Sequence, residues 1–152
     1  AWSFAGTHMS QMFTGVARAA FEHALQYCHE RKQGGQRLID HQLTRWRLDD
    51  MLRRVELCRS VARRSLAYAR LSPQTHPYVT ASAKVTVTQE AMKVVDEALQ
   101  LFGGFGTSRD YPMEKLHRDT RVALIEDGEN YVLTMRLGIL AEQLYAEGWS
   151  QP

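Results

Sequence analysis

The sequence has few cysteines and no long apolar run, and each shortage excludes a class of protein. Its two cysteines, Cys28 and Cys58, lie singly in helix-like segments and form neither a Cys-x-x-Cys motif nor the dense framework of a disulfide-stabilised domain. We therefore expect free thiols, as in proteins of a reducing compartment such as the cytoplasm. No apolar stretch approaches the roughly 20 residues of a membrane-spanning helix, so we expect no contact with a membrane.

An excess of one charge is also missing. The 19 lysines and arginines nearly balance the 17 aspartates and glutamates, and the formal net charge is +2. Arginines are concentrated at residues 53–64, yet no helix-turn-helix pattern precedes them. We expect this stretch to form a solvated helix face or a subunit interface, and we expect no nucleic-acid partner.

The residue patterns of metal-dependent and nucleophilic enzymes are missing too. A di-iron helical bundle needs two Glu-x-x-His pairs, and Glu114 with His117 form the only such pair. The six histidines share no metal-ligand spacing, and no serine or cysteine lies in a motif for nucleophilic catalysis. We therefore expect no bound metal, and we expect surface or capping roles for Glu114 and His117.

Helical periodicity extends over most of the sequence. Apolar residues recur at three- and four-residue steps in five segments, which predicts helices at residues 10–31, 41–71, 78–102, 113–121 and 130–147. Residues 84–88 alternate like a strand, but the longer helical pattern around them outweighs the short one. Long helices with short connections predict an all-α fold, an up-and-down four-helix-type bundle with a short extra helix, as a single domain over residues 1–152.

The same periods predict which side chains form the core. The candidates in the first helix are Met12, Val16, Ala20 and Tyr27; in the second Leu48, Met51, Val55, Cys58 and Ala62; in the third Val87, Ala91, Val94, Ala98 and Leu101; and in the last Val132, Met135, Ile139 and Leu140. Gly34 and Gly35 are expected to end the first helix, and Gly103 the third.

A glycine-rich loop follows the third predicted helix as Phe-Gly-Gly-Phe-Gly, residues 102–106. By itself such a loop is a helix stop and a turn. Glycines also let backbone N–H groups approach a phosphate-bearing ligand closely, so the loop can equally hold part of a nucleotide cofactor. A helix and not a strand precedes it, which argues against a Rossmann unit.

Residues 98–128, ALQLFGGFGTSRDYPMEKLHRDTRVALIEDG, resemble the C-terminal helical domain of the flavin-dependent acyl-CoA dehydrogenases. The matching motifs are Gln-x-x-Gly-Gly-x-Gly, Tyr-Pro, Glu-Lys-Leu, Arg-Asp and the closing glycine, and residues 29–42 resemble the family's arginine segment ending in glutamine. The resemblance covers essentially the whole chain. It implies the last of three domains of an FAD enzyme that acts on acyl-CoA as a homodimer or homotetramer, with helical N-terminal and middle β domains outside this chain.

The resemblance also implies which residues bind the cofactor. Arg31 and Gln42 match positions that contact the FAD of a neighbouring subunit. Gln100, Gly103 and Gly104 match the loop that touches the adenosine diphosphate part of that FAD. On this basis, the exposed glycines give the cofactor access to the backbone across a subunit interface.

The implied catalytic residue is Asp127. In the family, a glutamate directly before the glycine of the last motif removes the α-proton of the acyl-CoA, and Asp127 holds that position here, followed by Gly128 as an implied substrate-binding residue. If the register differs by one, the base is Glu126. A structural alternative for Asp127 is the N-cap of the last helix, a position that aspartate favours.

Several residues depart from the family pattern. Gly34 replaces a phenylalanine, Glu129 and Tyr131 stand where a threonine and a glutamine often meet the flavin, and Gly6 falls where some members carry a substrate-site arginine. An aspartate at position 127 also matches the nitroalkane oxidases, a further branch of the same fold. The resemblance implies α,β-dehydrogenation of an acyl-CoA thioester, with a nitroalkane oxidase-like flavoenzyme or a non-catalytic oligomerisation bundle as alternatives.

Overall fold

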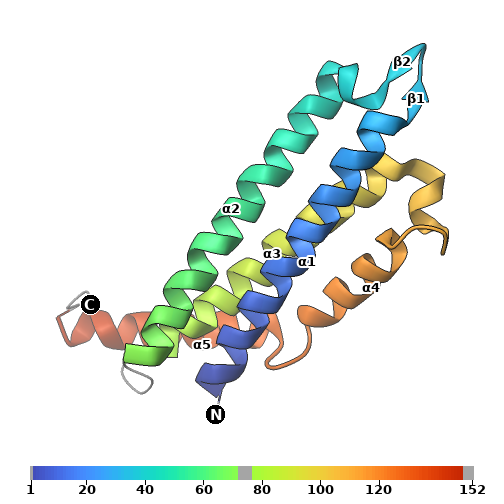
Figure 1. Cartoon of the computed structure of the whole chain (residues 1–152). Helices are drawn as coiled ribbons and strands as arrows, with labels where there is room; N and C mark the ends of the chain where they lie inside the picture. The colour runs from blue at the N-terminus through green and yellow to red at the C-terminus, as the bar shows by residue number, and fades with distance from the viewer. Residues whose placement is uncertain (1, 72–76, 149–152) are drawn as a thin grey trace.

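The fold is an elongated helical bundle, seen in a computed structural model that describes residues 2–71 and 77–148. Its helices are α1 (Trp2–Glu30), α2 (Gln42–Leu71), α3 (Pro77–Phe102), α4 (Met113–Ala123) and α5 (Asn130–Ala146). Figure 1 shows α1, α2 and α3 side by side, the short α4 along α1 and α3, and α5 lying across one end. The predicted all-α, four-helix-type architecture is confirmed. None of the helices in the described ranges is long and apolar enough to cross a membrane.

The helix boundaries agree closely with the prediction except at the start. Helix α1 begins at Trp2 and not at residue 10, because Gly6 lies inside the helix and does not interrupt it. A Cβ atom at Gly6 would lie 3.0 Å from the carbonyl oxygen of Thr80, so the glycine permits α1 and α3 to approach closely. Residues 84–88 are helical, with Lys84, Val87 and Thr88 buried on one face.

A small hairpin between α1 and α2 was not predicted. Strands β1 (Lys32–Gln33) and β2 (Gln36–Arg37) pair antiparallel around Gly34 and Gly35. Both glycines have positive φ, 64° and 83°, which the two-residue turn requires. The glycines do follow the end of α1, but they also form the hairpin that leads, through the 3-10 turn η1 (Leu38–Asp40), into α2.

The core lies where α1, α2 and α3 meet. The predicted core positions of α2 are buried, as are those of α3 except the half-buried Leu101. In α1, Ala20 and Tyr27 are buried, but Met12 is 54% exposed. Small alanines at 17, 20 and 24 allow the long helices to pack closely.

The core prediction for α5 is wrong. Val132, Met135 and Ile139 are 41%, 66% and 59% exposed, and Leu140 is half-buried. Leu133 is the buried apolar residue of this helix. The reason is that α5 lies across the end of the bundle and packs chiefly on α3, so its apolar residues face no second helix layer within the described part of the chain.

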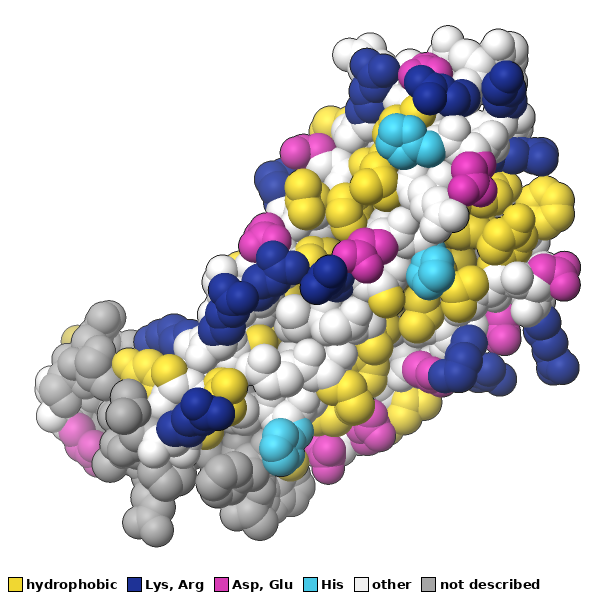
Figure 2. Space-filling view, viewed as in Figure 1, with side chains coloured by type: hydrophobic (Ala, Val, Ile, Leu, Met, Phe, Trp, Pro, Cys, Tyr) yellow, Lys and Arg dark blue, Asp and Glu magenta, His cyan; other side chains and the backbone are white. Residues whose placement is uncertain are grey.

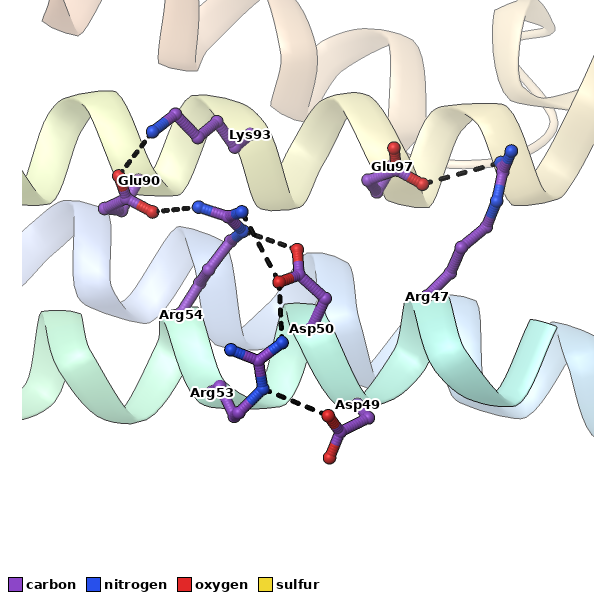
Figure 3. A network of polar contacts seen from close by, with 8 residues as sticks. All are labelled: Arg47, Asp49, Asp50, Arg53, Arg54, Glu90, Lys93 and Glu97. Atoms are coloured by element: carbon purple, nitrogen blue, oxygen red, sulfur yellow. Dashed lines mark hydrogen bonds and ion pairs between the residues drawn. The ribbon is translucent and has the colours of Figure 1, made fainter. Parts of the chain in front are cut away.

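Charged side chains connect α2 to α3. Figure 3 shows Arg54 of α2 donating hydrogen bonds to Asp50 on the same helix and to Glu90 on α3. Arg47 and Glu97 form a second bridge, with nitrogen and oxygen 3.5 Å apart. Arg53, Arg54 and Arg59 of the arginine-rich stretch are thus paired with acids. Figure 2 shows both signs of charge interspersed over this face.

Both cysteines are buried free thiols, as predicted. Burial raises the pKa of Cys28 and of Cys58 to about 11, so both stay protonated at neutral pH. They act as small core residues and not as reactive groups.

Two candidate functional sites at opposite ends of the bundle

A cleft lies beside the glycine-rich loop, which forms the 3-10 segment η2 (Gly103–Thr107). Its volume is about 620 Å³, and its lining residues are Tyr27, Arg31, Gln33, Leu38 and residues 100–105. The cleft therefore brings together four of the predicted cofactor residues, Arg31, Gln100, Gly103 and Gly104. Gln42 is not among the lining residues; it is the exposed first residue of α2 at the same end of the bundle.

The three positions in η2 that hold glycine differ in whether the backbone or the packing requires glycine there. Gly103 has φ +59°, a left-handed conformation that ends α3. Gly106 is buried, and a Cβ there would lie 2.7 Å from the carbonyl oxygen of Leu99. Gly104 is exposed and has no neighbour within 4 Å of a Cβ position, so neither packing nor a positive φ requires glycine there. Its open backbone is the feature available to a ligand.

Aromatic rings support this cleft. Tyr27 stacks on Phe102 with ring centroids 4.1 Å apart, and Tyr111 meets both rings edge-on. The guanidinium carbon of Arg31 lies 5.4 Å from the centre of the Phe105 ring. The cleft thus combines an exposed cation, amides and accessible backbone above a layer of packed aromatic rings. This set suits a diphosphate that is linked to a nucleobase.

A second, smaller cavity lies at the other end, between α1, α3 and α5. Its volume is about 160 Å³, and its lining residues are Gly6, Tyr78, Thr80, Ala81, Lys84, Asp127, Leu133, Arg136, Leu137 and Leu140. Asp127 is exposed at this cavity, whereas Glu126 is not among the lining residues. The close approach of Gly6 to α3 leaves no room for a large side chain where the cavity meets α1.

The turn between α4 and α5 presents Asp127. Asp127 has φ +50° and Gly128 φ +97°, so two successive residues are left-handed. The N-cap of α5 is Glu129, whose carboxylate accepts a hydrogen bond from the Val132 amide at 3.0 Å. The alternative role of Asp127 as the helix cap is therefore wrong: the turn places it two residues too early to cap α5.

Lys84 is a site residue that the sequence reasoning missed. Its side chain has 0% exposure, and Nζ donates to the carbonyl oxygen of Gly128 at 2.7 Å and to Oδ1 of Asn130 at 2.8 Å. The available signal was its spacing, three and seven residues before Val87 and Ala91 on the buried face of α3. Lysine is usually exposed in folded proteins, so the spacing alone did not predict that Lys84 is buried.

The two sites are far apart. Lys84 beside the small cavity and Gln100 beside the large cleft are sixteen residues apart on α3. At a helical rise of 1.5 Å per residue, this separation is about 24 Å. The two sites therefore lie towards opposite ends of α3.

Glu114 and His117 have ordinary surface partners. Glu114 pairs with Arg118 at 3.5 Å, and Nε2 of His117 lies 2.8 Å from Oδ1 of Asp96. Across residues 2–71 and 77–148, no three histidine, cysteine or acidic side chains form a group that could hold a metal ion. The surface roles expected for this pair agree with these contacts.

Comparisons with known proteins identify similar sequences and structures. A family model described as "Acyl-CoA dehydrogenase, C-terminal domain" matches residues 6–144. The chain is 36% identical over 118 residues to a short-chain specific acyl-CoA dehydrogenase of Clostridium acetobutylicum, covering 78% of this chain and 31% of that protein. It is 33% identical over 131 residues to cyclohexane-1-carbonyl-CoA dehydrogenase of Geobacter metallireducens, covering 86% and 33%.

A solved structure agrees with these relatives. The butyryl-CoA dehydrogenase of Megasphaera elsdenii superposes with a TM-score of 0.87 at 29% identity, over 93% of this chain and 37% of that one. The chain spans about a third of the length of the relatives it matches.

Proposed function

This chain belongs to the acyl-CoA dehydrogenase family as its C-terminal domain, and from that premise we propose that it is part of an FAD-dependent enzyme that desaturates an acyl-CoA thioester between the α and β carbons. The family predicted from the motifs is confirmed. We propose further that a helical N-terminal domain and a middle β domain complete the protein. The observation that carries the functional proposal is the Asp127 carboxylate at a cavity lined largely by apolar side chains.

The chemistry assigned to Asp127 is removal of the α-proton. That proton is weakly acidic, and its abstraction needs a carboxylate placed close to the α carbon in a site from which water is excluded. Leu133, Leu137 and Leu140 give the cavity beside Asp127 an apolar wall against which an acyl chain can pack. Gly128 has no side chain that could cover the neighbouring carboxylate.

The large cleft fits the adenosine diphosphate part of FAD. Arg31 supplies a positive charge, Gln100 an amide, and Gly104 an accessible backbone, since a Cβ there would point into open space. When bound, FAD supplies the acceptor for the β-hydride. We assign Arg31, Gln42, Gln100, Gly103 and Gly104 to the cofactor, with Gln42 contributing from outside the cleft.

The separation of about 24 Å between the two sites supports a homodimer or homotetramer. Each copy then offers its Asp127 end to its own flavin and its η2 end to the FAD of a neighbour, so that one chain serves two cofactors. Buried free thiols support a reducing compartment, and we propose the cytoplasm.

The test is a spectrum of the full-length protein that carries this domain. We expect a yellow protein with stoichiometric FAD, which butyryl-CoA or octanoyl-CoA bleaches under anaerobic conditions. Bleaching by nitroethane and by no acyl-CoA would favour the nitroalkane oxidase-like alternative, for which the aspartate at position 127 argues. A colourless protein that binds no FAD would favour the oligomerisation bundle. The isolated 152-residue chain is the control, and we expect it to retain no FAD.

A further inference from the structure

The Lys84 ammonium group lies wholly inside the fold. A buried charge destabilises a protein unless hydrogen-bond acceptors surround it, so the acceptors indicate what the charge does. Both acceptors of Lys84, the Gly128 carbonyl and the Asn130 side chain, belong to the turn between α4 and α5. This is the turn that carries Asp127.

The hydrogen bonds of Lys84 form a closed ring. Nδ2 of Asn130 donates to Oγ1 of Thr88 at 3.0 Å, and the Thr88 hydroxyl donates to the backbone carbonyl of Lys84 at 2.8 Å. The third side is the bond from Lys84 to Asn130. Because α3 contacts each of the other four helices that the structure describes, the ring ties the turn to the centre of the fold and not only to its own flanking helices.

The turn needs such support because its backbone is strained. Asp127 is the one non-glycine residue with positive φ in the described ranges. A non-glycine residue in this region is strained and persists only where its surroundings hold it. The carbonyl that Lys84 binds belongs to the next residue, Gly128, whose φ is also positive. The backbone N–H of Asn130 closes the other side of the turn by donating to the Leu124 carbonyl at 3.0 Å.

We propose that Lys84 is a positioning residue for Asp127: by holding the Gly128 carbonyl, it fixes the left-handed turn that keeps the Asp127 carboxylate at the cavity between α1, α3 and α5. The inference rests on the proposed function, because it concerns how the base is held. Lys84 touches no reacting atom and acts through the turn. A misplacement of about 1 Å can lower a catalytic rate about a hundredfold, so a rigid turn matters for a base on a short side chain.

The charges around Lys84 agree with this role. Burial lowers the pKa of Lys84, while the carboxylates of Asp127, Glu126 and Glu129 act to raise it. Arg136 of α5 lines the same cavity. The carboxylates of the turn thus stabilise the protonated, donating form of Lys84. The protonated form then donates the hydrogen bonds that hold the turn in place.

The first test needs no substrate. Lys84→Met keeps a long, unbranched side chain and removes both hydrogen bonds to the turn. In the full-length protein we expect faster hydrogen–deuterium exchange over residues 124–130, because the backbone N–H of Asn130 is no longer held against the Leu124 carbonyl. Val87→Ala is the matched control, since it shortens a buried side chain on the next turn of α3 without touching this ring. Unchanged exchange over the turn in Lys84→Met would overturn the proposal.

The second test separates positioning from a general structural role. With saturating butyryl-CoA, we expect Lys84→Met to slow flavin reduction roughly 10- to 100-fold, with little change in the half-saturating substrate concentration. In the Asp127→Asn background the same substitution has little further effect, because no base remains to be misplaced. Equal slowing in both backgrounds would overturn the inference. If Asp127→Asn alone left the rate unchanged, the proposed function would fail, and the exchange result would still decide whether Lys84 holds the turn.

Discussion

At the scale of single residues, Gly104 and Gly106 give opposite predictions although both lie in η2. An alanine at Gly106 puts its Cβ against the Leu99 carbonyl, at 2.7 Å before any shift, so Gly106→Ala is expected to destabilise the protein by about 1–3 kcal/mol. An alanine at Gly104 meets nothing within 4 Å, so Gly104→Ala is expected to leave stability unchanged. It does place a methyl group where we propose that FAD approaches the backbone.

The measurements are the thermal unfolding midpoint and the FAD affinity of the full-length protein. Gly106→Ala lowers the midpoint. Gly104→Ala keeps it and weakens FAD binding by about tenfold, equivalent to 1.4 kcal/mol. Tight FAD binding in Gly104→Ala would argue against this loop as a cofactor site, whereas a lowered midpoint in that variant would contradict the open geometry.

Residue roles were harder to predict than residue positions. The sequence places Asp127 directly before a helix, a position where an N-cap is expected, but it does not encode the left-handed backbone that moves the cap to Glu129. Lys84 carries a charge, and its burial depends on acceptors some forty residues further along the chain. The burial of Lys84 therefore depends on tertiary contacts, which local propensity does not include.

At the scale of helices, the ion pair between Arg54 of α2 and Glu90 of α3 predicts that the stability of the fold depends on pH. Burial raises the pKa of Glu90, but hydrogen bonds from Lys93 and Arg54 outweigh burial, so the pKa is lowered overall. A carboxyl with a lowered pKa in the folded state stabilises the fold above its unfolded-state pKa, about 4.3, and loses that effect as the pH falls through the lower folded value. Glu90→Gln is expected to cost about 1–2 kcal/mol at neutral pH and progressively less in acid.

The matched control for Glu90 is Glu56. It pairs with Arg59 on one exposed helix face, where its side chain is 52% exposed, so Glu56→Gln is expected to change stability by well under about 1 kcal/mol. Urea unfolding of both variants at neutral and at acid pH measures the difference. A cost for Glu90→Gln that is constant across this pH range would contradict the assigned role of the ion pair.

Helix formation was predictable because periodicity is local, whereas packing partners were not. The periods of α2 and α3 predicted both the helix and its buried face, since each packs against the two other long helices. The period of α5 gave the helix but the wrong face, because that helix lies across the end of the bundle. The hairpin at Gly34 and Gly35 was missed because four paired residues are too few to form a strand pattern.

At the scale of the whole molecule, the exposed apolar side of α5 predicts association. Tyr131, Met135 and Ile139 are spaced by four residues and are 83%, 66% and 59% exposed, which forms an apolar stripe on one helix face. Such a stripe is covered in a stable protein by another domain or subunit. The isolated 152-residue chain is therefore expected to self-associate, as measured by light scattering at high protein concentration.

Two variants test whether the stripe is responsible. Replacing Met135 and Ile139 with lysine is expected to shift the chain towards the monomer. Met12→Lys, at a similarly exposed apolar position on α1, serves as the control and leaves association in place. A wild-type chain that stays strictly monomeric would contradict the prediction.

We propose that the Asp127 carboxylate is the base that removes the α-proton of an acyl-CoA. The measurement is the single-turnover rate of flavin reduction by saturating butyryl-CoA in the full-length protein, compared between wild type, Asp127→Asn and Glu126→Gln. Asparagine tolerates the left-handed backbone at this position, so the fold should be preserved while the rate falls by roughly 10²–10⁴-fold. Glu126 does not line the cavity, so Glu126→Gln should leave the rate of flavin reduction unchanged. A wild-type rate in Asp127→Asn, above all together with an inactive Glu126→Gln, would contradict the assignment.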